Sequence, residues 1–373
     1  MSKGGLEGVV ASDSAIGKIK GSDGELRYRG YLIKDLADHS SFVETAFLLW
    51  HGELPSTSEL EALHEELRVA RALSSDLVDV LRVVAKTHLP MDALRTLVSA
   101  AGTGHFDGEM SHPEEVLKHA IRLTAYLPTM TAAYDRLRKG LEPLPPRDDL
   151  SHAANFLYML TGEEPEQEIE SMLDTCLILH AEHGFNASTF SGRVTAATLS
   201  DIYSAVTSAI GTLKGPLHGG ANTAVMNMLL EINSVEAVEP RLDEMLASKQ
   251  KIMGFGHRVY KVIDPRAVIL KEFSRRMSEI KGESLWYDMS TKLETLMTER
   301  KGIDMNVDFY SASTYYSMGI DPDLFTTIFA ISRVAGWTAH VMEQYGNNRL
   351  IRPRSNWVGA EPRDYLAMDQ RSG

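Results

Sequence analysis

Residues 214–222 read KGPLHGGAN, which places one histidine, His218, among three glycines and a proline. Glycine tolerates positive φ angles and lets the backbone approach a ligand closely, whereas proline fixes φ and lacks an N–H donor. The preceding residues 196–213 are rich in alanine, serine and threonine and nearly uncharged, as in a helix packed closely on several sides. We therefore expect a break between helices at His218, as at a domain hinge or a functional site. We expect residues 196–213 in the centre of the molecule or at a subunit interface.

The rest of the chain carries repeated helix-start signals. The capping box, a serine followed three residues later by a glutamate, occurs at Ser41, Ser56 and Ser111. An aspartate followed by a proline, the pattern of an N-cap before the first helical residue, occurs at Asp264 and Asp321. Together these signals predict a mainly α fold.

Strand signals are few, and one helical face is well marked. Short hairpins are expected only at residues 25–31 and within the first fifteen residues. The helical face is predicted from residues at spacings of four, three and four, which are Met172, Cys176, Leu179 and His183.

Length and composition are those of a soluble globular protein of about two domains, with 373 residues, 43% hydrophobic and 24% charged. The single cysteine, Cys176, excludes an intrachain disulfide and fits a reducing compartment. The sequence has neither an apolar run of about eighteen residues nor an apolar N-terminal signal. We therefore expect a cytoplasmic protein.

The formal net charge of -13 argues against nucleic-acid or membrane partners, since both require a basic surface. An anionic ligand would have to be bound by a local basic cluster. For any single cation a solvated surface position is the default. The candidates gather towards the C-terminus and are Arg258, Lys261, Arg266, Arg333, Arg349, Arg352 and Arg354.

Two further histidines, His180 and His183, lie three residues apart in the sequence HAEH. The pair lacks the spacing of a zinc-binding H-E-x-x-H helix, and the single cysteine offers little further ligation, so no metal is expected. We interpret His180 as a core residue whose ring is satisfied by backbone carbonyls.

A second glycine-flanked histidine and an aromatic-flanked acid complete the candidates. Residues 251–261, KIMGFGHRVYK, surround His257 with glycines and cations but lack the third glycine and the preceding strand of a dinucleotide-binding turn. A loop that approaches an anionic or purine-bearing ligand fits better. Asp308, in the sequence NVDFYS, is either the N-cap of a helix that begins nearby or a buried base with a raised pKa.

In this order, GPLHGGAN (215–222), GFGHRVYKVIDPR (254–266) and NVDFYS (306–311) resemble the three catalytic segments of the citrate synthase family. The resemblance extends from residues 5–9 to residues 350–354 and so covers nearly the whole chain. It is closest to the short dimeric type of bacteria and archaea.

The resemblance implies catalytic roles for three residues. Asp308 would remove a proton from the acetyl methyl group of acetyl-CoA, and His218 would hydrogen-bond the thioester oxygen as the enol or enolate forms. His257 would polarise the ketone of oxaloacetate and protonate the new alkoxide. Hydrolysis of citryl-CoA would then release citrate and CoA. Acetyl-CoA is a substrate in this reaction, and no cofactor is expected.

The resemblance also implies the substrate contacts. His183, Arg266 and Arg333 would bind oxaloacetate, whose carboxylates suit guanidinium groups, together with Arg352, or the nearby Arg354, from a second subunit. Ser188 would support His218. The CoA-binding residues would be Met253, Gly254, Phe255, Gly256 and Lys261, with the loop backbone recognising adenine and the lysine near the phosphates.

The family fold is an all-helical homodimer with two domains. The large domain would comprise residues 1–219 and 319–373, with the dimer core and the oxaloacetate site. The mobile small domain, residues 220–318, would carry the CoA site. His218 would lie at their junction, and oxaloacetate binding would close the small domain and exclude water.

Three alternatives are open. A 2-methylcitrate synthase shares the fold and the catalytic residues but prefers propionyl-CoA, and one methylene changes binding by only about 1 to 3 kcal/mol. A catalytically silent CoA-binding protein is disfavoured by the presence of Asp308, His218 and His257 together, since a binder needs no base. A metal-dependent lyase using His180 and His183 would lose activity with a chelator.

Overall fold

The computed structural model describes residues 4–6, 8–103, 112–257, 259–260 and 262–371. Within these residues the protein is built from sixteen α-helices, one small sheet and three 3-10 helices, which confirms the mainly α class. None of these helices has both the length and the apolar character needed to cross a membrane.

The N-terminal part supplies the sheet and ten helices. The strands are β1 (Gly17–Lys20), β2 (Glu25–Tyr28) and β3 (Tyr31–Leu32), paired antiparallel in the order β1-β2-β3 with Lys18 opposite Arg27. The helices are α1 (Ile33–His39), α2 (Phe42–His51), α3 (Thr57–Ala70), α4 (Ser75–Val84), α5 (Pro90–Ala101), α6 (Pro113–Arg138), α7 (His152–Thr161), α8 (Gln167–His180), α9 (Ala187–Ala196) and α10 (Ile202–Leu213).

The C-terminal part begins after the break at His218. Its helices are α11 (Ala221–Ile232), α12 (Val238–Ala247), α13 (Pro265–Lys281), α14 (Leu285–Lys301), α15 (Val307–Ser317) and α16 (Phe325–Gly346). The short 3-10 helices are η1 (Gly4–Leu6), η2 (Pro322–Leu324) and η3 (Met368–Gln370).

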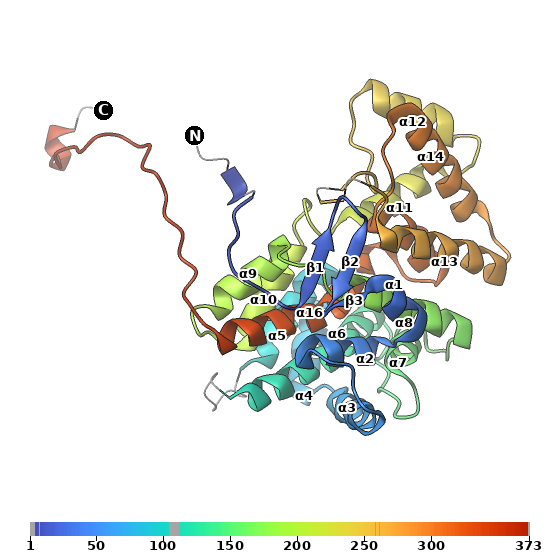
Figure 1. Cartoon of the computed structure of the whole chain (residues 1–373), viewed down its shortest axis with the longest axis horizontal. Helices are drawn as coiled ribbons and strands as arrows, with labels where there is room; N and C mark the ends of the chain where they lie inside the picture. Colours follow the sequence, from blue (N-terminus) through green and yellow to red (C-terminus); the bar gives the residue numbers. More distant parts are fainter. Residues whose placement is uncertain (1–3, 7, 104–111, 258, 261, 372–373) are drawn as a thin grey trace.

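Helix α16 is the central element of the fold. It packs against α2, α6, α8, α9 and α10, and nearly all of its side chains are buried, Trp337 among the largest. A helix that is apolar around most of its circumference belongs in the core. Helices α11 to α15 pack on one another beside this core, to the right in Figure 1, and α13 reaches back to α1 and α8.

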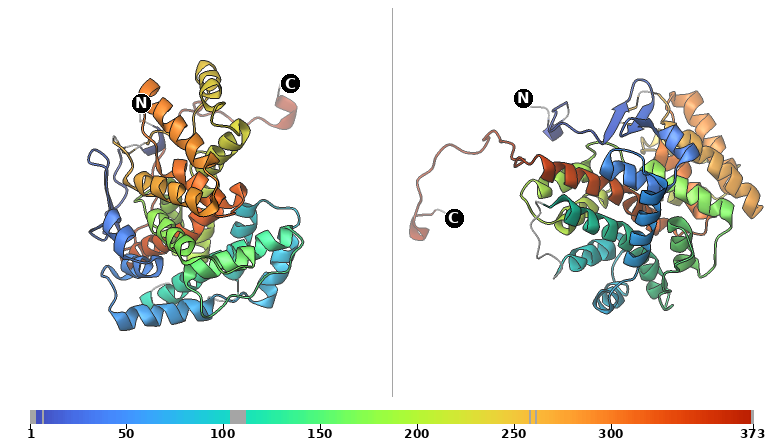
Figure 2. Two further views of the ribbon diagram at one scale, coloured as in Figure 1. Left: turned by 90° about the vertical axis from the view of Figure 1, so that its right-hand side faces the viewer. Right: turned by 60° about the horizontal axis from the view of Figure 1, so that its bottom comes forward.

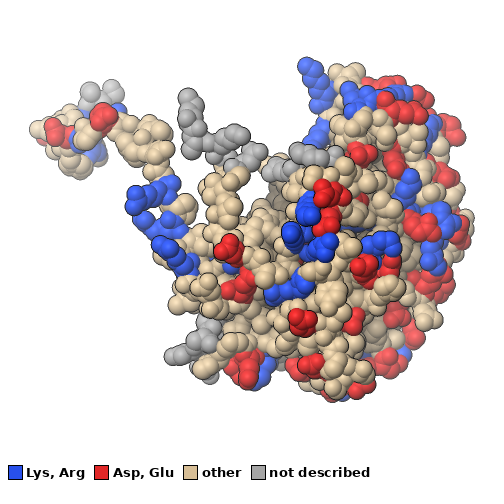
Figure 3. Space-filling view, viewed as in Figure 1, with Lys and Arg blue, Asp and Glu red and all other residues tan. Residues whose placement is uncertain are grey.

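The C-terminal segment leaves the body after α16. Residues 352–371 are exposed and carry large apolar side chains in water, Trp357 at 82% and Tyr365 at 88% exposure. The segment runs away from the helices in each view (Figures 1 and 2). Figure 3 shows basic side chains along its first part, which contains Arg349, Arg352 and Arg354.

Most predicted helix starts are confirmed. Ser41 caps α2, and Ser56 forms a full capping box with Glu59 at the start of α3. Asp264 caps α13 and accepts a hydrogen bond from Arg266 N at 3.1 Å. Asp321 precedes the 3-10 helix η2 instead of an α-helix. The predicted cap at Ser111 lies outside the described residues, and α6 begins at Pro113 after His112.

Three expectations about segments were wrong. Residues 196–213 are not one helix, because α9 ends at Ala196, a turn follows, and Asp201 caps α10. The hairpin expected at residues 25–31 is confirmed, since β2 pairs antiparallel with β3 and Tyr28 lies opposite Tyr31, but the described part of the first fifteen residues contains no strand. Helix α8 ends at His180, so His183 lies in the following turn instead of on the helical face.

Candidate active site

His218 lies in the turn between α10 and α11. The turn is tight: Gly219 N donates to Leu213 O at 2.9 Å, and a Cβ on Gly219 would stand 2.5 Å from that oxygen, which no larger residue tolerates. The Nε2 atom of His218 is 2.8 Å from Ser188 Oγ, which also accepts a hydrogen bond from Trp337 Nε1 at 3.1 Å. Ser188, predicted to support His218, is therefore in contact with it.

His183 and His257 come together at an aromatic cluster. Their ring centroids are 5.4 Å apart, and His183 Nε2 lies 3.2 Å from the hydroxyl of Tyr260. Tyr260 is also close to His257, with centroids 4.6 Å apart. Two histidines that are 74 positions apart in the chain therefore share one small volume, and Tyr260 is a neighbour of both that the sequence did not single out.

The tautomer of His257 follows from its hydrogen bonds. Its Nδ1 accepts the backbone N–H groups of Val259 at 3.0 Å and Tyr260 at 3.1 Å, so Nδ1 carries no proton and Nε2 is the N–H donor. Burial, followed by the positive charge of Arg266, lowers the pKa of His257 to about 4. At neutral pH this imidazole is an uncharged donor.

Asp308 lies in the first turn of α15 but is not its cap. Asn306 is the N-cap, and its Oδ1 accepts Asp308 N at 3.0 Å, so the interpretation of Asp308 as an N-cap was wrong. Burial raises the pKa of Asp308 to about 6, and the charges of Arg266 and Arg333 oppose this shift. A buried carboxylate with a raised pKa is a candidate general base.

Two buried guanidinium groups face this acid and the histidines. Arg266 and Arg333 are 2% and 1% exposed. Arg266 forms a two-point ion pair with Asp264, at 3.0 and 2.8 Å, and Arg333 Nε donates to His180 O at 2.6 Å. After burial, the charges of these two arginines are the main causes that lower the pKa of His183. Cations, neutral imidazoles and one acid are thus brought together in an arrangement suited to a dicarboxylate.

The predicted CoA loop is hydrogen-bonded to the segment that carries Asp308. Gly254 has φ +83°, and a Cβ there would lie 2.8 Å from Phe309, so the backbone packs directly on α15. Asn306 N donates to Gly254 O and Asn306 Nδ2 donates to Gly256 O, both at 2.9 Å. The ring of Phe255 also packs against the tilted ring of Phe309. Met253 is half-buried beside them. Lys261 and Arg258 lie outside the described residues.

The remaining predicted residues are not part of this cluster. Arg352 and Arg354 are exposed on the C-terminal segment, which projects from the body. His180 is a core residue, as expected, with its Nδ1 2.8 Å from Cys176 O. Among the described residues, no three histidine, cysteine, aspartate or glutamate side chains are arranged to hold a metal ion.

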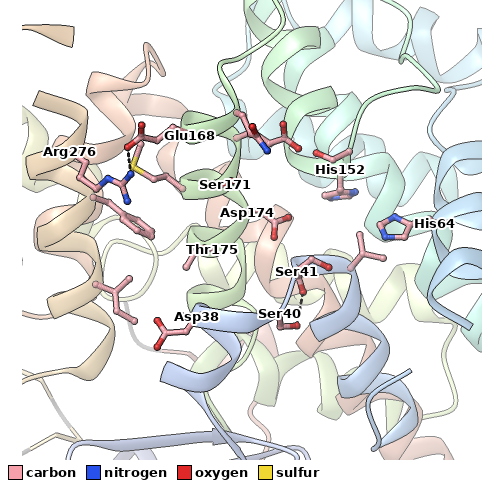
Figure 4. A pocket seen from close by; sticks show the side chains of 18 residues that line it. Asp38, Ser40, Ser41, His64, His152, Glu168, Ser171, Asp174, Thr175 and Arg276 are labelled. Carbon is pink, nitrogen blue, oxygen red and sulfur yellow. Dashed lines mark hydrogen bonds and ion pairs between the residues drawn. The ribbon is translucent and has the colours of Figure 1, made fainter. Parts of the chain in front are cut away.

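A cavity of about 760 Å³ lies elsewhere, along α8, and is bounded also by α1, α2, α7 and α13 (Figure 4). It is lined by Asp38, Asp174 and His152 among others, and the ion pair of Glu168 with Arg276 links α8 to α13 there. None of the predicted site residues lines it. The candidate active site is therefore defined by the convergence of side chains and not by this cavity.

Known proteins resemble this chain over its full length. A family model described as "Citrate synthase, C-terminal domain" matches residues 5–354. The chain is 50% identical to citrate synthase 2 of Bacillus subtilis and to citrate synthase of Haloferax volcanii, each alignment covering 99% of both proteins. It is 44% identical to 2-methylcitrate synthase of Mycobacterium tuberculosis over 97% of this chain and 91% of that protein.

Solved structures of citrate synthases also superpose closely on this chain. Citrate synthase from Thermotoga maritima superposes with a TM-score of 0.89 at 41% identity, covering all of both chains. The enzyme from Thermoplasma acidophilum, solved in a ternary complex with carboxymethyl coenzyme A and oxaloacetate, superposes with a TM-score of 0.91 at 33% identity, covering 98% of both chains.

Proposed function

This chain belongs to the citrate synthase family, and we propose from this premise that it condenses acetyl-CoA with oxaloacetate and hydrolyses citryl-CoA to citrate and CoA. It is an acyltransferase that converts the acyl group into an alkyl group on transfer. The observation that carries the proposal is the convergence of Asp308, a base with a raised pKa, with the neutral donor His257 and two buried arginines.

Asp308 is the base in this proposal. A methyl group next to a thioester is a weak carbon acid, so its deprotonation needs a base and a hydrogen-bond donor that stabilises the oxygen. Asp308 with a pKa of about 6 is largely ionised at neutral pH and is more basic than an ordinary aspartate. His218, held by Ser188 at 2.8 Å, is the residue that hydrogen-bonds the thioester oxygen as the enolate forms.

His257 acts on the second substrate. Because its Nδ1 accepts two backbone N–H groups, its Nε2–H is directed away from its own loop and is available to the ketone oxygen of oxaloacetate. That hydrogen bond polarises the ketone, and the same proton can pass to the new alkoxide. The pKa of about 4 keeps the ring neutral and therefore a donor on one nitrogen only.

His183, Arg266 and Arg333 are proposed to bind the carboxylates of oxaloacetate. The guanidinium of Arg266 is shared with Asp264 before substrate binds, which offsets the cost of its burial. The partner subunit's Arg352, or its Arg354, would complete the site in a homodimer. Their exposed positions on a projecting segment with unburied Trp357 support this proposal, because such a segment gains stability by packing on another surface.

We propose the domain division 1–219 with 319–373, and 220–318. The bonds of Asn306 to Gly254 and Gly256 support it, because they make the CoA loop of Met253, Gly254, Phe255 and Gly256 move as one unit with Asp308. Closure of this unit over oxaloacetate would exclude water. Lys261 is proposed to lie near the CoA phosphates. We propose neither a cofactor nor a metal. We propose a cytoplasmic location, since the only cysteine is a buried free thiol.

The test is thiol release from acetyl-CoA and, in parallel, from propionyl-CoA, each with and without oxaloacetate and with a chelator present. We expect rapid release that requires oxaloacetate, persists with the chelator and is much faster with acetyl-CoA. Equal or reversed acyl preference would assign the chain to the 2-methylcitrate branch of its relatives. Release with neither substrate would refute the proposed reaction in favour of a silent CoA-binding protein.

A further inference from the structure

Glu182, the residue before His183, is a carboxylate that is completely buried beside the candidate active site. Two glycines make room for it. A Cβ on Gly17 of β1 would lie 2.7 Å from its Oε1, and one on Gly336 of α16 would lie 2.7 Å from its Oε2. Burying a carboxylate costs several kcal/mol unless it is hydrogen-bonded or paired, so the fold is organised to keep this one in place.

The carboxylate of Glu182 holds the turn that carries His183. Its Oε1 accepts the N–H of Gly184, while its own backbone N–H donates to the hydroxyl of Tyr28 at 3.2 Å. Gly184 has φ +58°, so the turn needs a residue in the left-handed region and an acceptor for its N–H. His183 stands between these two residues, so both bonds hold the backbone that carries its ring.

His340 is the second partner of this carboxylate, and its tautomer can be deduced. His340 Nδ1 lies 3.1 Å from Arg193 Nη1, and its Nε2 lies 3.1 Å from Glu182 Oε1. A guanidinium only donates, so Nδ1 must accept, and the ring proton is on Nε2, directed at Glu182. Arg193 is fixed in turn by Glu343 at 2.6 Å and Gln344 at 3.1 Å.

These contacts form a directed chain of donors from α9 through α16 to the turn. Arg193 donates to His340, His340 donates to Glu182, and Glu182 accepts the N–H of Gly184. The side chains of Arg193, His340 and Glu182 are at most 2% exposed. Arg333, one turn before Gly336 on α16, faces the same carboxylate. Burial lowers the pKa of Arg333 to about 10, and the charge of Glu182 is the largest effect that opposes this shift.

We propose that Glu182 is a positioning residue for oxaloacetate, which fixes the His183 turn beside Arg333 and is itself oriented by His340 and Arg193. It does not touch the reacting atoms. The proposal rests on the proposed function, since it assumes that His183 and Arg333 bind oxaloacetate. Its signature is a weaker capture of oxaloacetate with little change in the chemical step, because Asp308, His218 and His257 are left in place.

Two substitutions of His340 separate this role from simple packing. In His340→Gln the amide nitrogen takes the place of Nε2 and can still donate to Glu182. In His340→Asn the shorter amide reaches Arg193 with its oxygen but leaves Glu182 without that donor. We expect His340→Asn to raise the KM for oxaloacetate about 10-fold or more, as for loss of a hydrogen bond to a charged group, with kcat and the KM for acetyl-CoA within about 3-fold. His340→Gln should keep the oxaloacetate KM within about 3-fold.

A second route and a control complete the experiment. Glu182→Asp withdraws the carboxylate by one methylene and should show the same rise in oxaloacetate KM, so the test survives a failure of His340→Asn to fold. Ser332→Ala removes a buried hydroxyl of α16 that donates to Leu177 O and takes no part in the hydrogen bonds from Arg193 to Gly184. It should therefore leave the oxaloacetate KM unchanged. Calorimetric titration of each variant with oxaloacetate checks that KM reports binding.

Equal oxaloacetate KM values for the Gln and Asn variants would overturn the proposal, as would a loss confined to kcat. A parent enzyme that releases no thiol from acetyl-CoA would instead refute the proposed function itself. The two failures are therefore distinguishable in one set of assays.

Discussion

Asn306 and Asp308 are joined by a hydrogen bond of 3.0 Å, in which the cap residue of α15 accepts the N–H of the candidate base. The other end of the same amide donates to Gly256 O at 2.9 Å. One side chain thus fixes both the start of the helix that carries Asp308 and the loop proposed to bind CoA.

Substitution of Asn306 should therefore affect stability and CoA binding together. Asn306→Ala removes the cap, which costs about 0.5 to 2 kcal/mol of unfolding free energy, and frees the loop, so the KM for acetyl-CoA should rise. Asn306→Asp is the matched control, because aspartate caps well but has no donor for Gly256 O. It should keep the stability and still raise the KM. Denaturant unfolding and steady-state kinetics measure the two effects, and a normal KM in both variants would contradict the role of the loop bond.

Asp308→Asn should leave oxaloacetate binding nearly intact and lower turnover by at least about two orders of magnitude, the usual contribution of a general base. The amide has nearly the same shape but cannot take up the proton. Calorimetry with oxaloacetate and single-turnover thiol release measure the two properties. Turnover close to that of the parent would refute Asp308 as the base.

The pH dependence of the reaction should follow the ionisation of the Asp308 carboxylate. The raised pKa of about 6 means that Asp308 loses its charge as the pH falls through 6, so kcat/KM for acetyl-CoA should fall about tenfold per pH unit below that value. His257, with its pKa lowered to about 4, stays neutral over this range, so the pH profile should show no second ionisation. A profile measured from pH 5 to 8 checks this, and a rate that is flat down to pH 5 would contradict it.

The three motif segments could be predicted from the sequence because each carries its chemistry in consecutive residues. Glycines around His218 and His257 mark close backbone approaches, and the structure has them at Gly219 and Gly254. The resemblance to a known family then supplied the roles. The mainly α class followed from capping signals, several of which are local bonds within three residues, such as Ser56 with Glu59.

What escaped prediction depends on partners that are distant in the chain. Glu182 owes its importance to His340, 158 positions away, and no local pattern indicates that contact. Its one sequence signal is a charge two residues after the apolar stretch that ends α8. The end of α8 itself was missed because Gly184, with its positive φ, and the buried carboxylate draw His183 into a turn. The capping residue of α15 was misplaced by two positions because asparagine at 306 already satisfies the helix start.

Arg352 gives the sharpest test of a shared active site. Arg352→Ala should raise the KM for oxaloacetate without dissociating the dimer, since the side chain is exposed and the substitution leaves the rest of the C-terminal segment unchanged. Arg354→Ala is the matched control and tells which of the two arginines is used. Size-exclusion chromatography with light scattering checks the assembly.

Mixing two impaired variants, assayed at an oxaloacetate concentration too low for either variant alone to turn over, extends this test. In a hybrid dimer of Asp308→Asn and Arg352→Ala chains, one site carries both defects, while the other combines an intact Asp308 with the partner subunit's Arg352. Co-expressed chains with different tags, purified on both, should therefore recover about half the activity of the parent dimer if the sites act independently. If Arg352 instead served the site of its own chain, each site of the hybrid would keep one defect and no activity would return.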